Sequence, residues 1–139
     1  MAMGSPDRVY KEYQVHTLSQ EKLVLMLYDG ALRFCQEAIS ALGRRDYAQA
    51  NESLIKAQDI LSELMAGVNR DLGEVAENLY QIYSFIYRYL VRANIKKSQA
   101  MVEEATDLLK QIREAWVEAM GRHRTRDYST RPGARSWQG

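Results

Sequence analysis

The chain has 139 residues, of which 46% are hydrophobic and 27% are charged, with a formal net charge of +1 at pH 7. This balance is typical of a single globular domain and excludes a chain that is disordered throughout. No apolar run approaches the ~18 residues of a membrane span, and a single Cys35 forms no intrachain disulfide, so we expect a cytoplasmic protein without stable membrane insertion.

Residues 1–18 are predicted to form an N-terminal arm, in which residues 1–5 resemble an expression-vector remnant. The arm carries apolar residues, among them Tyr10 and Val15, in a segment too short to form a stable helix alone in water. We expect the arm to fold back over a hydrophobic surface, with Tyr10 as its anchor. A frayed terminus is the alternative.

Apolar residues at spacings of three and four then predict helices that each bury one face. The first helix is predicted to begin at Ser19, a candidate N-cap, and to end near Gly43. Asp46 is the candidate cap of a second helix, whose apolar stripe runs to Val68.

Residues 67–73 are predicted to form a loop, because glycines stand at both ends and polar residues between them. A third helix is predicted from Glu74 to Ile95. Ser98 is the candidate cap of a fourth helix, which is expected to reach Gly121.

Short connections between helices of similar length favour antiparallel neighbours. The predicted fold class is therefore all-α, an antiparallel up-down four-helix bundle over residues 19–121. Leu61 and Ile112 lie centrally in their stripes and are expected to be buried. Gly30 lies in the middle of the first helix, where Gly costs ~1 kcal/mol relative to Ala. The expected reason is the close approach of a neighbouring backbone.

Residues 122–139 are predicted to be a flexible, disordered, Arg-rich tail. They contain five arginines and one aspartate, whereas residues 1–120 carry 14 basic and 17 acidic side chains. A solubilising tail is the favoured interpretation, and no nucleic acid is expected as a partner, because the acidic body would repel a polyanion. The alternative function, from a different class, is a helical-bundle adaptor whose basic tail contacts nucleic acid or acidic membrane.

The first and third helices have more apolar surface than a bundle requires. With residues placed at ~100° intervals, the apolar arc spans roughly 200° in the first helix and roughly 240° in the third. Deeper burial or contact with a second copy would explain this excess, and so would a groove for an amphipathic segment of another protein. The candidate partner-binding residues, in the groove and the arm, are Tyr10, Val15, Leu25, Tyr28, Leu32, Ile55, Tyr80, Phe85, Tyr87 and Tyr89.

No catalytic or metal-binding motif is visible. Two histidines and one cysteine are too few for a zinc or di-iron site, and there is no phosphate loop or GxSxG turn. Cys35 lies on the apolar side of the first helix and is interpreted as a small buried hydrophobe, not as a nucleophile. We expect a protein that is not an enzyme and that needs no cofactor.

Several stretches of the sequence, in order, resemble one family. Residues 21–31 (EKLVLMLYDGA) are similar to the helix-one signature of the FliS family of flagellin-specific export chaperones, and residues 51–60 (NESLIKAQDI) resemble its second-helix run. The similarity covers roughly residues 9–120 and does not extend to the tail. Further positions that resemble the family are Tyr10, Val15, Thr17, Asn78, Leu79, Tyr83, Arg88, Leu90, Ala93, Asn94, Ala115 and Trp116; departures occur at Gln20 and Ser84.

The resemblance implies an antiparallel helical bundle that binds the disordered C-terminal segment of flagellin. Binding would prevent premature polymerisation and help to deliver flagellin, as a cargo complex, to the flagellar type III export gate. The free protein is expected to be a monomer or a homodimer.

Overall fold

The computed structural model describes the backbone of residues 6–130 and the side chains of residues 20–122. The described backbone forms four α-helices and one short 3-10 turn: α1 (Pro6–Gly43), α2 (Tyr47–Ala66), η1 (Arg70–Leu72), α3 (Glu74–Lys96) and α4 (Gln99–Thr130). No strand occurs between residues 6 and 130. The predicted all-α class is confirmed.

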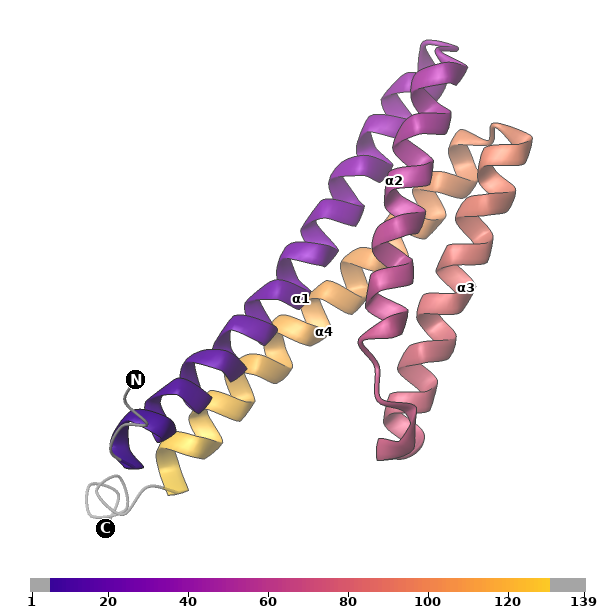
Figure 1. Cartoon of the computed structure of the whole chain (residues 1–139). Coiled ribbons are helices and arrows are strands. Elements are labelled where there is room, and N and C mark those ends of the chain that lie inside the picture. Colours follow the sequence, from indigo (N-terminus) through magenta and orange to yellow (C-terminus); the bar gives the residue numbers. More distant parts are fainter. Residues whose placement is uncertain (1–5, 131–139) are drawn as a thin grey trace.

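The helices alternate in direction along the chain, so that α1 and α3 run one way and α2 and α4 run the other (Figure 1). Each helix packs against two others, and the pairs α1–α2, α2–α3, α3–α4 and α1–α4 close a ring. The packing between α3 and α4 is the least extensive of the four. This is the predicted up-down bundle.

The core is built from the predicted apolar stripes. Small side chains recur on the buried face of α1, which lets α2 approach closely. Leu61 is fully buried, as predicted, whereas Ile112 is only half-buried at the edge of the core. The fully buried residues of α1 and α2 are Tyr28, Ala31, Cys35, Ala38, Ala41, Ser53, Leu54, Ala50, Ala57 and Leu61.

The space beside Gly30 is occupied by a side chain of a neighbouring helix and not by a backbone. A Cβ atom at this position would lie 3.1 Å from Cδ1 of Ile60 on α2. The expected close approach of a backbone is therefore wrong, although the glycine does face a neighbouring helix.

Two predicted helix caps are present. The side chain of Asp46 accepts a hydrogen bond from the backbone N–H of Gln49 at 3.2 Å, and Ser98 Oγ accepts one from the N–H of Met101 at 3.2 Å. Each bond satisfies a backbone donor that has no partner within the helix. These two starts were correctly predicted from local sequence.

The two outer helices are longer than predicted. α1 runs through Ser19 back to Pro6, and α4 runs through Gly121 to Thr130. In the view of Figure 1 both extensions pass beyond the ends of α2 and α3. The described helices thus run past the predicted ends at Ser19 and Gly121. The fold-back of the arm and the flexibility of the tail stay predictions. The remaining predictions for residues 1–5 and 131–139 lie outside the described residues.

Candidate partner-binding surface

An open cleft of about 650 Å³ lies at the end of the bundle where α2 connects to α3. This is also where the α2–α3 hairpin separates from the extended α1–α4 pair (Figure 1). Its volume is in the range of protein ligand sites. Every helix contributes an apolar side chain to it: Leu23, Val24, Leu27, Leu64, Leu79 and Trp116.

Two aromatic side chains that line the cleft, Tyr83 and Trp116, both contact Tyr28 in the core behind it. Tyr83 lines the cleft but is only 2% exposed, and its hydroxyl shares a hydrogen bond with that of Tyr28. The rings of Tyr28 and Trp116 meet edge to face with centroids 6.2 Å apart. Burial raises the pKa of both tyrosines, so the hydroxyls stay protonated at neutral pH. The two tyrosine side chains are therefore uncharged, and their hydroxyls are paired with each other.

Exposed leucines lie at the edge of the cleft, together with the polar residues Gln20, Glu63 and Asn69. Leu23 on α1 is 54% exposed, and Leu72 in η1 is 78% exposed on the opposite side. Isolated exposed leucines are common, but two on either side of an apolar cleft provide contact area for a partner.

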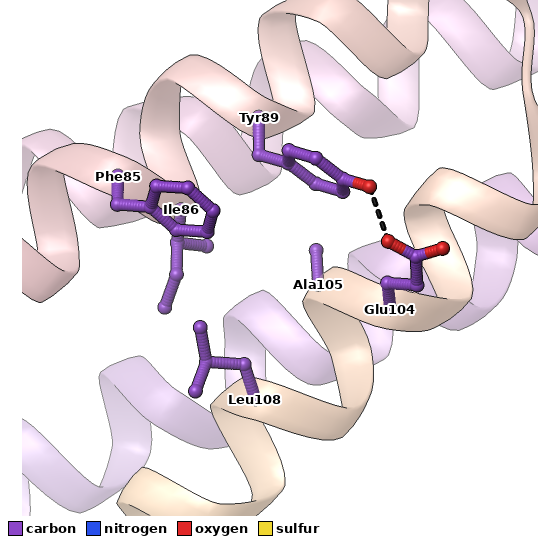
Figure 2. A pocket seen from close by; sticks show the side chains of 6 residues that line it. All are labelled: Phe85, Ile86, Tyr89, Glu104, Ala105 and Leu108. Carbon is purple, nitrogen blue, oxygen red and sulfur yellow. Dashed lines mark hydrogen bonds between the residues drawn. The ribbon is translucent and has the colours of Figure 1, made fainter.

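A second, smaller hollow of about 140 Å³ lies in the seam between α3 and α4. Phe85 stacks on Tyr89 with ring centroids 5.6 Å apart and an interplanar angle of 19°. The Tyr89 hydroxyl donates a hydrogen bond to Glu104 across the seam, and Leu108 closes one side (Figure 2). Phe85 remains 47% exposed. The seam thus presents an aromatic surface next to solvent.

The structure separates the ten residues predicted for partner binding. It brings Phe85 and Tyr89 together in the seam, as one surface. It places Tyr28 in the core with no exposed surface, which corrects its assignment to a groove: its hydroxyl is paired with a hydroxyl of α3 and needs no water. Tyr80 is half-buried and lies beneath the guanidinium of Arg70, 3.9 Å from the ring centroid.

The other predicted residues whose side chains are described line neither hollow. Leu32 and Tyr87 are half-buried against the core, Leu25 is half-buried, and Ile55 is 44% exposed on α2. The side chains of Tyr10 and Val15 lie outside the described range.

Sequence reasoning missed the residues of the larger cleft. Leu27 and Leu79 belong to regular apolar stripes, and a stripe cannot show that part of it is left uncovered. Leu72 did offer a signal, because it is a lone leucine in the polar stretch between Arg70 and Gly73. A leucine does not stabilise a solvated loop, so Leu72 could have been proposed as a residue that contacts a partner.

The chemistry of the described residues favours binding over catalysis. No group of three or more His, Cys, Asp or Glu side chains in the described residues could hold a metal ion. Burial raises the pKa of Cys35 to about 12, which leaves its thiol protonated and unreactive. Within the described part of the chain, no helix is long and apolar enough to cross a membrane. What the surface offers is apolar contact area.

Comparison with known proteins agrees on one family. Residues 3–123 match the family model of the flagellar protein FliS. Among curated relatives named flagellar secretion chaperone FliS, the protein of Bacillus subtilis strain 168 is 38% identical over 120 residues, which covers 86% of this chain and 90% of the relative. The protein of Salmonella typhimurium strain LT2 is 35% identical over 111 residues, covering 78% and 82%. That of Vibrio cholerae is 29% identical over 110 residues, covering 78% and 81%.

Proposed function

This chain belongs to the FliS family of flagellar secretion chaperones, and we propose that it binds the C-terminal segment of flagellin in the cytosol before export. The family is not enzymatic, so its members act by holding a client protein. Binding would keep flagellin from polymerising prematurely and would present it to the flagellar type III export gate as a cargo complex.

The open cleft between the two helical hairpins supports this proposal best. A disordered segment with an apolar face can bury that face there, against side chains from all four helices. Ordering the segment costs free energy, which lowers the net affinity and suits a cargo that must be released unfolded. The aromatic seam of Phe85 and Tyr89 extends the proposed surface along α3 and α4.

The test is calorimetric titration of the protein with the C-terminal segment of flagellin from the same organism. Leu23→Asp places a carboxylate on the rim of the cleft, at a side chain that is 54% exposed, so folding should be preserved. We expect at least about a tenfold loss of affinity, because a bound segment would bury that charge without a partner. Ile95→Asp is the matched control, since Ile95 is 76% exposed near the opposite end of α3.

Two results would contradict the proposal. The first is a parent protein that does not bind the flagellin segment, and the second is equal affinity for the parent and Leu23→Asp. Repeating the titration at higher salt separates the alternative adaptor function, because contacts with phosphate weaken steeply with salt whereas apolar contacts do not.

A further inference from the structure

One wall of the cleft includes a turn, residues 69–72, that the core does not hold in place. Gly67, Val68, Asn69 and Leu72 of the α2–α3 connection line the cleft. Yet residues 69–75 are all exposed, and η1 contains no buried residue. Val68 packs against the core, but apolar burial does not fix the exposed part of this wall, from Asn69 to Leu72. Something else must hold it if the cleft is formed before a partner arrives.

Arg70 makes the side-chain contacts that join this turn to α3. Its Nε lies 2.7 Å from Glu77 Oε1 and its Nη2 lies 2.9 Å from Glu77 Oε2, a two-pronged ion pair. The guanidinium also lies over the ring of Tyr80, with Cζ 3.9 Å from the ring centroid. Gln81 donates a further hydrogen bond to Glu77 at 2.7 Å, which orients the carboxylate. A planar guanidinium held on one edge and one face has little freedom to turn.

Hydrogen bonds within the turn connect Arg70 to Leu72 at the rim of the cleft. Asn69 Oδ1 accepts a hydrogen bond from the N–H of Asp71 at 3.1 Å, and the Asn69 carbonyl accepts one from the N–H of Leu72 at 3.1 Å. These bonds close a tight turn around Arg70, so fixing the arginine also fixes Leu72. Released from α3, the turn would let Leu72 collapse into the apolar cleft or move away from it, and a partner would have to order it again.

We propose that Arg70 is a positioning residue for cargo recognition, because its grip on Glu77 and Tyr80 holds the α2–α3 connection as a preformed wall with Leu72 at the rim. The inference rests on the proposed function, since the flagellin segment is taken as the ligand of this cleft. A positive charge at position 70 is not sufficient for this role. A lysine has no planar group that could form both hydrogen bonds to Glu77.

The experiment compares the full-length parent with Arg70→Ala and Arg70→Lys and with the exchanged pair Arg70→Glu with Glu77→Arg. Arg122→Ala is the matched control, because Arg122 forms an exposed ion pair with Glu118 at 2.6 Å on α4 and lines neither hollow. Two quantities are measured: amide hydrogen exchange at Leu72 in the free protein, and affinity for the C-terminal segment of flagellin from the same organism.

We expect faster exchange at Leu72 and roughly two- to tenfold weaker binding in Arg70→Ala, the cost of ordering one or two side chains on association. Arg70→Lys should resemble Arg70→Ala, the exchanged pair should recover part of both losses, and Arg122→Ala should match the parent. The free energy of unfolding should change little, since the ion pair is exposed.

The outcomes separate the two proposals. If Arg70→Ala exchanges like the parent, or exchanges faster but binds the segment equally well, the role of Arg70 is overturned while flagellin binding by the parent still stands. If the parent binds no flagellin segment, the proposed function fails, and the recognition role of Arg70 fails with it.

Discussion

Leu61 is a residue whose environment is set by the periodicity of its helix. It lies on α2 within the core and has no exposed surface. Leu61→Ala would leave a cavity, so we expect the free energy of unfolding to fall by about 2–5 kcal/mol in urea denaturation. Ile112→Ala is the comparison. Because Ile112 is only half-buried, its truncation should lower the free energy of unfolding by clearly less. A loss below about 0.5 kcal/mol for Leu61→Ala, the level of a surface substitution, would show that the core has another register.

Tyr28 and Tyr83 show what periodicity does not reveal. A tyrosine in a wide apolar arc suggests a wet hydroxyl, but here two hydroxyls from α1 and α3 satisfy each other in the core. The two residues are 55 positions apart, and no pattern within one helix predicts that they meet. Tyr28 therefore contributes to the core and not to a groove.

This tyrosine pair should make the fold sensitive to alkaline pH. Burial raises the pKa of both residues above the ordinary value of 10.0, so the folded state holds their protons more tightly than the unfolded chain does. Their contribution to stability is complete below pH 10.0 and is lost progressively as the pH rises above it. In Tyr28→Phe with Tyr83→Phe, the fall in unfolding free energy above that pH should be shallower than in the parent. Equal slopes for both proteins in urea titrations would refute this assignment.

The helices themselves differ in how well local sequence predicts their ends. The starts of α2 and α4 were predicted because a side chain at each start pairs with a backbone N–H only a few residues away. The extension of α1 past Ser19 and of α4 past Gly121 was not predicted from local sequence. A serine or a glycine can stand where a helix ends, but neither residue forces a helix to end there. At Gly121 the space around the residue does not require a glycine, because a Cβ atom would meet nothing within 4 Å.

The two confirmed caps give a test at this scale. Asp46→Ala and Ser98→Ala each remove one acceptor for a helix N-terminus, so each should lower the free energy of unfolding by about 1 kcal/mol. Asp46→Asn, which keeps the acceptor, should retain most of the stability. Unchanged stability in thermal or urea unfolding of both alanine variants would mean that water replaces these caps at no cost.

At the scale of the whole molecule, the fold class and the family follow from the sequence, but the cleft does not. Resemblance at residues 21–31 and 51–60 indicated FliS, and the family match over residues 3–123 confirms it. The cleft arises where one hairpin separates from the other and a loop anchored by Arg70 closes the side. Such a feature depends on the relative placement of four helices, which apolar periodicity leaves open.

The extensions of α1 and α4 lead to a prediction that revises the expected role of the arm. The described side chains that line the cleft belong to residues between Gln20 and Trp116. The backbone of residues 6–18 continues α1 as a helix, so we expect that the arm does not act as a lid. We expect that deleting residues 1–18 will not increase the binding of a hydrophobic dye, and that deleting residues 123–139 will leave both folding and flagellin affinity unchanged.

Affinity after the N-terminal deletion decides whether Tyr10 and Val15 contact cargo. α1 forms one wall of the cleft from Gln20 onward, and its extension prolongs that wall beyond the ends of α2 and α3. A segment that follows the wall would lose contacts, so the deletion should weaken flagellin binding and never strengthen it. Stronger flagellin binding together with more bound dye would instead support the hypothesis that the arm covers the cleft as a lid. Unchanged binding would remove Tyr10 and Val15 from the proposed surface and confine recognition to the cleft and the seam.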